Sequence, residues 1–84
     1  MRFKSRGDEK MLNACVLIKI VPTKADPILE AVKTIKEVRK AYLTYGRFDI
    51  VAFLEVEDYK ELREVTIHIN EIPGVRSTET LAEG

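Results

Sequence analysis

The residues best suited to chemistry in this chain form a short turn, Gly46-Arg47-Phe48-Asp49. Glycine adopts the positive φ angles that tight turns need, and it leaves room for a ligand close to the backbone. Aspartate is disfavoured in strands, yet Asp49 opens a predicted strand. A carboxylate beside free backbone N–H groups can bind a free amino acid, with the ammonium at Asp49 and the ligand carboxylate at the amides. The alternative is a purely structural turn, because glycine and aspartate are ordinary turn residues.

A second polar group lies near the C-terminus, in Ser77-Thr78-Glu79-Thr80. Side chains alternate between the two faces of a strand, so Thr78 and Thr80 share one face with Arg76. Two hydroxyls on one face can line a polar pocket. The alternative is an edge strand that is kept polar, which discourages aggregation.

The chain contains one histidine, His68, and one cysteine, Cys15. These two residues alone can build neither a metal site nor a Cys–His nucleophilic pair. A buried cysteine usually behaves as a small apolar residue. We therefore expect structural roles for both, and we predict no catalytic residue, no metal site and no cofactor.

Aromatic residues raise the question of nucleic-acid binding. RNA-recognition motifs stack bases on aromatic residues of their third strand and carry a basic residue followed by glycine. Here Arg47 is followed by Phe48-Asp49-Ile50-Val51, so the signature is absent. Packing in the core or in an interface is the better interpretation of the aromatic side chains, which are Tyr42, Tyr45, Phe48 and Phe53.

The elements that must position these residues follow the order strand, helix, strand, strand, helix, strand. Asp26 can cap the first helix, with Pro27 at its first position, where the missing N–H costs nothing. Asp58 begins the second helix, and Glu61 completes a D-x-x-E version of the capping box. The strands are predicted at residues 13–21, 38–45, 49–56 and 75–81. Apolar residues at helical spacing are Ile28, Ala31, Val32 and Ile35 in the first helix, and Leu62, Val65 and Ile69 in the second.

A faint internal repeat relates the two halves of the chain, since I-x-x-V-R occurs at residues 35–39 and again at 72–76. Each half is then one strand–helix–strand unit, and two units in tandem form a ferredoxin-like plait. Right-handed crossovers place both helices on one face of the sheet. The predicted fold class is therefore α+β, a βαββαβ plait with an antiparallel four-stranded sheet.

The predicted strands are apolar on both faces, although two helices can cover only one. The segments 13–21 and 50–56 are nearly continuous apolar runs, which is typical of strands that are buried on both sides. The uncovered face needs a partner, and a second copy of the chain is the simplest one. A chain of 84 residues also gains stability from oligomerisation. We therefore expect a homo-oligomer that dimerises through the sheet.

Composition narrows the functional classes. The 14 basic and 14 acidic residues cancel, whereas a self-sufficient nucleic-acid binder usually carries a basic excess. A single cysteine suggests a reducing compartment, no apolar run is long enough for a membrane span, and the start lacks the apolar region of a signal peptide. We expect a cytoplasmic protein with no direct DNA binding and no membrane contact.

The ends of the chain lie outside the predicted plait. Residues 1–11 are predicted as an N-terminal arm, residues 12–82 as the domain, and residues 83–84 as a short tail. Met1 and Phe3 alternate with basic residues, which would let a short strand pair with a partner chain. Met11 is an alternative start of translation, which the intact mass of the natively expressed protein would reveal.

The plait order, the turn at residues 45–49 and the segment at 72–80 together resemble the Lrp/AsnC family of feast/famine regulators, and more narrowly its C-terminal effector-binding domain, the RAM domain. Family members place a helix-turn-helix domain before this module, and too few residues precede the first strand here for one. The resemblance implies a stand-alone effector domain that dimerises through the sheets and assembles into an octamer, a tetramer of dimers. It also implies a small amino acid bound between dimers.

Carried over residue by residue, Gly46 and Asp49 match the G-x-x-D turn of the family, and two threonines match its last strand. Phe48 stands where the family often has tyrosine, and Tyr45 stands where threonine is common. The predicted ligand-binding residues are Gly46, Arg47, Phe48, Asp49, Thr78 and Thr80.

The sequence thus predicts a non-enzymatic amino-acid sensor that acts by ligand-dependent oligomerisation or by co-assembly with a full-length Lrp/AsnC paralogue. An ACT-like regulatory module with the same topology is one alternative. A small dimeric αβ-barrel enzyme is another, although it would need convergent polar groups beyond His68. An acylphosphatase would need a glycine-rich loop with an arginine after the first strand, and residues 21–24 offer neither.

Overall fold

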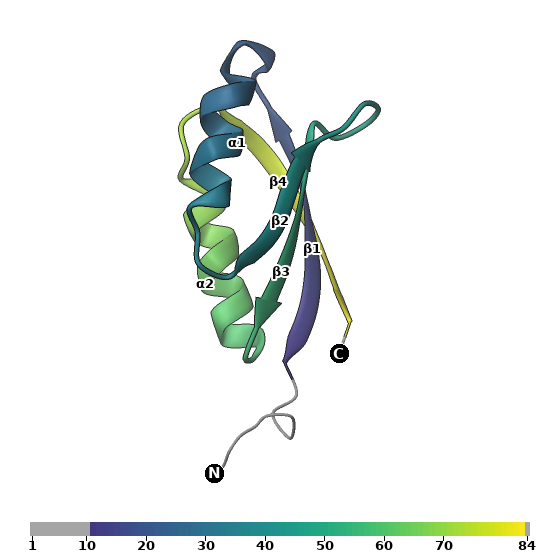
Figure 1. The fold of residues 1–84 in the computed structure, drawn as a ribbon, viewed down its shortest axis with the longest axis vertical. Helices are drawn as coiled ribbons and strands as arrows, with labels where there is room; N and C mark the ends of the chain where they lie inside the picture. The colour runs from purple at the N-terminus through teal and green to yellow at the C-terminus, as the bar shows by residue number, and fades with distance from the viewer. Residues whose placement is uncertain (1–10, 84) are drawn as a thin grey trace.

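The computed structural model describes residues 11–83, so the predicted pairing of Met1 and Phe3 lies outside the described part of the chain. The elements are β1 (Leu12–Ile20), a 3₁₀ turn η1 (Pro22–Lys24), α1 (Ala25–Lys33), β2 (Val38–Leu43), β3 (Ile50–Val56), α2 (Tyr59–Asn70) and β4 (Val75–Glu83). Both helices pack on one side of the sheet (Figure 1). The predicted ferredoxin-like plait is therefore confirmed.

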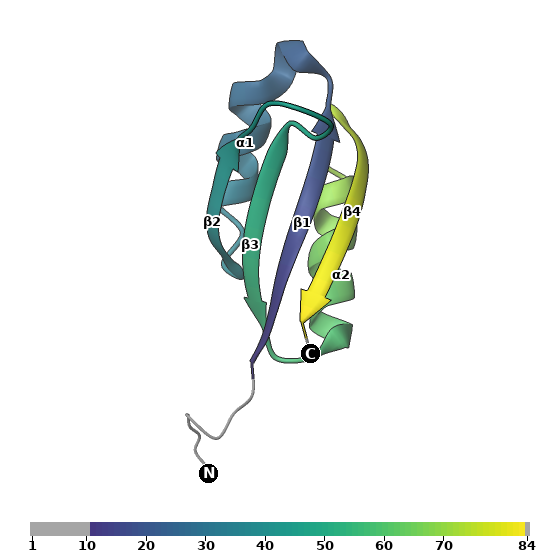
Figure 2. The ribbon, with the colours of Figure 1, turned by 90° about the vertical axis from the view of Figure 1, so that its right-hand side faces the viewer.

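The sheet is fully antiparallel, with the strand order β2-β3-β1-β4 (Figure 2). β1 lies between β3 and β4, so that Val16 is opposite Ala52 on one side and Thr80 on the other. Residues opposite each other in an antiparallel pair point to the same face. The register therefore assigns every strand residue to the helix-covered inner face or to the outer face.

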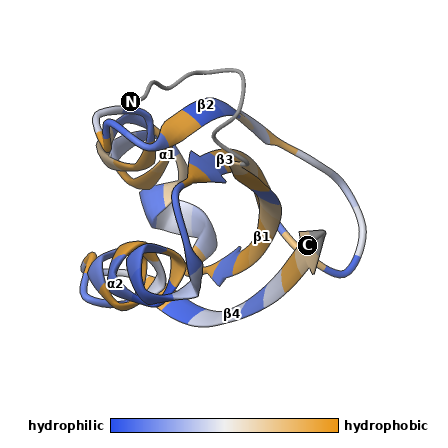
Figure 3. Cartoon of the chain, turned by 90° about the horizontal axis from the view of Figure 1, so that it is seen from below, coloured by the Kyte–Doolittle hydropathy of each residue, from blue (hydrophilic) through white to orange (hydrophobic). Residues whose placement is uncertain are grey.

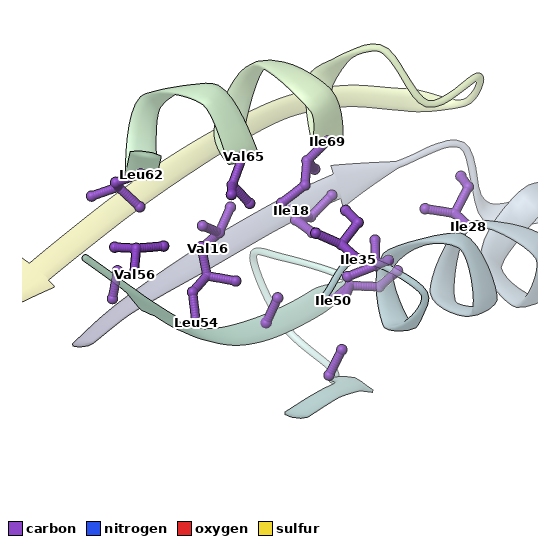
Figure 4. Packing of buried hydrophobic residues seen from close by; sticks show 14 of the residues in the cluster. Val16, Ile18, Ile28, Ile35, Ile50, Leu54, Val56, Leu62, Val65 and Ile69 are labelled. Atoms are coloured by element: carbon purple, nitrogen blue, oxygen red, sulfur yellow. The ribbon is translucent and has the colours of Figure 1, made fainter. Parts of the chain in front are cut away.

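The hydrophobic core fills the space between the helices and the inner face (Figure 4). Every second residue of β1 and β3 is buried there, because side chains alternate along a strand. The predicted apolar stripe of α2 is confirmed, since Leu62, Val65 and Ile69 are all buried. The inner-face residues of the two central strands are Ala14, Val16, Ile18 and Ile20, and Ile50, Ala52, Leu54 and Val56.

The predicted cap of α2 is confirmed. Oδ1 of Asp58 accepts a hydrogen bond from the backbone N–H of Glu61 (2.8 Å), and the Glu61 carboxylate accepts one from the N–H of Glu57 (2.7 Å). The second bond reaches one residue further back than a standard capping box would place it. The start of α2 is thus specified by residues that are neighbours in the sequence.

The predicted cap of α1 is wrong. The turn η1 continues directly into α1, so that Lys24 becomes the N-cap, with no side-chain hydrogen bond. Asp26 already lies inside the first helical turn, where its charge suits the positive end of the helix dipole. Pro27 is the third helical residue and still falls among the N–H groups that have no partner within the helix. Neither α1 nor α2 is long and apolar enough to cross a membrane.

Gly74 lies in the turn between α2 and β4, close to η1 and α1. It has φ +99°, and a Cβ atom there would lie 2.7 Å from Cδ1 of Ile28 and 3.2 Å from Cβ of Lys24. Its carbonyl accepts a hydrogen bond from the N–H of Val21 (2.8 Å). The position therefore requires glycine both for backbone conformation and for space.

Candidate functional site

The turn between β2 and β3 is closed by its own hydrogen bonds. β2 ends at Leu43 rather than at the predicted Tyr45. The N–H of Thr44 then donates to the carbonyl of Asp49 (2.8 Å) across the start of the turn. The Thr44 hydroxyl also donates to the carbonyl of Phe48 (2.7 Å). Gly46 has φ +127° with no atom within 4 Å of its Cβ position, so glycine is needed there for conformation alone. The turn projects away from the helices (Figure 1), and Tyr45 at its apex is fully exposed.

Asp49 fastens this turn to the end of β1. Its backbone N–H donates to the carbonyl of Ile18 (2.9 Å), and its Oδ2 atom accepts from the N–H of Ile20 (3.0 Å). Lys19, between them, donates from Nζ to the carbonyl of Arg47 (3.2 Å). The sequence gives no signal for these contacts, because the partners are 28 to 31 residues apart.

The Asp49 carboxylate therefore accepts one structural hydrogen bond and has lone pairs that can accept more. An ionised carboxylate offers about four lone-pair sites, and within residues 11–83 only Oδ2 accepts a hydrogen bond. No residue among 11–83 donates a hydrogen bond to the other oxygen. A ligand at Asp49 would meet a carboxylate whose position is already set by Ile20.

Thr78 and Thr80 lie on the inner side of β4. Thr78 is opposite Ile18 and Thr80 is opposite Val16, two residues of the helix-covered face. Thr78 is hydrogen-bonded to Asn70 at the end of α2 (3.1 Å). This asparagine was not among the predicted site residues, although its place at the helix end beside the last strand is a usable signal.

The structure does not bring the two groups of candidate residues together within one copy. The turn at residues 44–49 projects on the outer side of the sheet, whereas Thr78 and Thr80 face the helices. No hydrogen bond joins them in the described chain. Within one copy, the hydrogen bonds of the described residues therefore do not combine the two groups into one site.

The outer face of the sheet carries apolar side chains that no other element of residues 11–83 covers. Tyr42 and Phe53 lie side by side, with ring centroids 6.0 Å apart. A shallow hollow of about 300 Å³ next to Phe53 is lined by Cys15 and Leu81 among others. Partial burial raises the pKa of the Cys15 thiol. Figure 3 shows the two layers end-on, with hydrophobic segments on the central strands.

A charged pair lies at the edge of this outer face. The register of β2 shifts at Arg39, between Val38 and Lys40. Arg39 binds Oε1 of Glu55 through both Nε (2.9 Å) and Nη2 (2.8 Å). A surface pair of this kind contributes little to stability, so its main effect is to place polar groups at the rim of an apolar patch.

The described residues contain no cluster of three or more potential metal ligands. His68 is exposed on α2, and Cys15 lies on the outer face of the sheet. The two residues thus belong to opposite layers. The arrangement offers hydrogen-bonding groups and an apolar surface, which suit binding.

Comparison with known proteins places this fold in a family. The family model of the Lrp/AsnC ligand binding domain matches residues 13–82. The chain belongs to this family. No curated protein has a significantly similar sequence.

Solved structures agree with the assignment. TTHA0845 from Thermus thermophilus is 32% identical, with 88% of this chain and 94% of that chain covered and a TM-score of 0.85. Protein PHS023 from Pyrococcus horikoshii is 27% identical, with 88% and 90% covered and a TM-score of 0.80. Escherichia coli AsnC shares the fold at 24% identity and a TM-score of 0.82, over 99% of this chain and 58% of AsnC.

Proposed function

We propose that this Lrp/AsnC ligand-binding domain is a non-enzymatic sensor of small amino acids that acts in the cytoplasm through ligand-dependent self-association. The observation that carries the proposal is the separation of the candidate residues. The turn with Asp49 and the hydroxyls of Thr78 and Thr80 lie on opposite sides of one sheet. A site that uses both groups exists only where two copies meet, so binding and assembly become coupled.

Self-association is proposed to begin at the outer face of the sheet. Phe53, Tyr42 and Leu81 are large apolar side chains that remain exposed there. A contiguous apolar patch of this kind marks an interaction surface, and a second copy supplies a matching one. Dimers then meet at the projecting turns, and the proposed final assembly is an octamer. Co-assembly with a full-length Lrp/AsnC regulator would use the same surfaces.

The proposed ligand contacts follow from the chemistry of the two groups. The second oxygen of Asp49 accepts from the ligand ammonium, and the backbone amides of Gly46, Arg47 and Phe48 in the same turn are further donors for the ligand. The hydroxyls of Thr78 and Thr80 from another copy reach the ligand carboxylate. A ligand held between copies shifts the population of assemblies by its preference for the assembled form.

Light scattering on a size-exclusion column tests the proposal, with and without a mixture of the twenty amino acids. The expected result is a dimer or larger assembly whose mass changes with one component of the mixture. An assembly that is indifferent to all twenty would contradict amino-acid sensing and leave only a structural adaptor.

Substitution of Asp49 tests its role directly. We expect Asp49→Ala to abolish amino-acid binding and to leave the dimer intact. Asp49→Asn is the sharper variant, because its amide oxygen can still accept from the N–H of Ile20 while the negative charge is lost. Asp26→Ala is the matched control, since Asp26 is exposed and makes no cap. Unchanged affinity in Asp49→Asn, measured by isothermal titration calorimetry, would remove Asp49 from the site.

A further inference from the structure

Asn70, the last residue of α2, forms a polar unit with Thr78 on β4. Its Nδ2 atom donates to the carbonyl of Thr66 (3.0 Å) and to Oγ1 of Thr78 (3.1 Å). The first bond lies within α2, and the second crosses from the helix to the edge strand. The side chain of Asn70 is thus held from one side and itself holds the hydroxyl of Thr78.

These two bonds determine the orientation of the amide. A backbone carbonyl only accepts hydrogen bonds, so the Asn70 atom that faces Thr66 must be the NH₂ group. Both amide hydrogens are then used, one toward Thr66 and one toward Thr78. The amide cannot be flipped without placing its oxygen against the Thr66 carbonyl.

The orientation of Asn70 makes the Thr78 hydroxyl a donor. Because Oγ1 of Thr78 accepts from Nδ2, its own proton is left to donate elsewhere. The only acceptor that it has within the described residues is Oδ1 of Asn70 itself, at a longer distance of 3.4 Å. A carboxylate is a much better acceptor than this neutral oxygen, because charge-assisted bonds are shorter and stronger.

We infer that Asn70 is a positioning residue of the effector site, which holds Thr78 ready to donate to the carboxylate of a free amino acid. The inference rests on the proposed function and narrows its ligand class. Ligands must carry an unblocked carboxylate, and the corresponding carboxamides bind less tightly. Asn70 acts through Thr78 and does not itself contact the ligand.

Calorimetric titration of each of the twenty L-amino acids into the full chain tests this role. Amino acids that bind are then titrated, together with their carboxamides, into Asn70→Ala, Thr78→Val and the double variant. We expect Asn70→Ala to weaken binding about tenfold, which is the order of one net hydrogen bond. Added to Thr78→Val, it should cause no further loss, because a residue that acts only through the hydroxyl has no effect without it.

Two readouts separate positioning from a general structural effect. His68→Ala, an exposed substitution on the same helical turn, is the matched control and should bind as the wild type does. Three-bond NMR couplings of Thr78, measured without any ligand, should report one χ1 rotamer in the wild type and an average in Asn70→Ala.

The outcomes distinguish this inference from the proposed function. If the wild type binds none of the twenty amino acids, both are overturned. If it binds, three results overturn the inference alone: equal affinity of Asn70→Ala, additive losses in the double variant, or an unchanged Thr78 rotamer. Equal binding of an amino acid and its carboxamide would also remove Thr78 from the carboxylate end.

Discussion

The two faces of the sheet use the same strands and differ in what covers them. On the inner face, Ile18 is fully buried under the helices, whereas Phe53 on the outer face is 39% exposed and Leu81 is 53% exposed. Apolar side chains in water are costly, at roughly 25 cal/mol per Å². The inner face therefore accounts for the fold of one copy, and the outer face is the surface that we propose meets another copy.

The same comparison applies to polar groups. The inner side holds Thr78 against Asn70, and the outer side carries the turn fastened by Asp49. A single copy thus separates the groups that the sequence suggested as one site. If the two groups form one site, that site depends on how copies of the chain assemble.

The largest expected effect comes from creating a cavity in the core at the inner face of the sheet. Ile18→Ala should lower the free energy of unfolding by about 2–5 kcal/mol, because it leaves a cavity in a fully packed region. Ile67→Ala makes the same chemical change at a side chain that is 49% exposed on α2, and it should cost much less. Urea denaturation at a fixed protein concentration measures both. Equal losses would contradict the contrast between core and surface.

The next effect concerns the outer face and should appear in assembly. Phe53→Asp places a charge at the centre of the apolar patch, and we expect it to raise the dissociation constant of the dimer about 100-fold or more. Light scattering over a dilution series measures the change, and circular dichroism should show an intact fold. Tyr59→Asp is the control, since Tyr59 is 61% exposed but belongs to α2. A dimer that survives Phe53→Asp would place the contact elsewhere.

Gly74 tests how tightly the helix layer fits the sheet. Gly74→Ala should destabilise the fold by about 1–3 kcal/mol, because the backbone is strained and the new methyl group meets Ile28. Gly46 also has a positive φ, so Gly46→Ala introduces the same kind of backbone strain, but its new methyl group meets no other atom within 4 Å. The difference between the stability losses of the two variants, measured by thermal unfolding, therefore gives the contribution of the steric clash at Gly74. If Gly46→Ala were the more destabilising, the packing argument at Gly74 would be wrong.

The smallest effect is the reactivity of Cys15 on the outer face. Its pKa is raised above the ordinary value of 9.0 by burial, so the folded state favours the thiol. Any stability that this preference contributes is present below pH 9.0 and is lost as the pH rises through the folded pKa. Alkylation by iodoacetamide at about pH 8 should be several-fold slower in the folded chain than in urea, because the thiolate is the reactive form. A faster reaction in the folded chain would refute this burial.

Comparison of the predicted and observed elements shows which signals are local. The capping box of Asp58 and Glu61 was predicted correctly, because both partners lie in one helical turn. The cap at Asp26 was wrong, because η1 runs into α1 and moves the helix start before it. The candidate ligand contacts of the turn and of Thr78 and Thr80 stay predictions, and the experiments above test them.

The order of elements, the inner face and the surplus of apolar residues on the outer face could all be read from the amino-acid pattern alone. These follow from spacing of two in strands and of three to four in helices, which involves near neighbours only. The tertiary structure alone decided that Asp49 binds the N–H of Ile20 and that Asn70 holds Thr78. Such contacts depend on strand register and on how the helix end meets the sheet, and the free energy that selects them comes from the packed core as a whole.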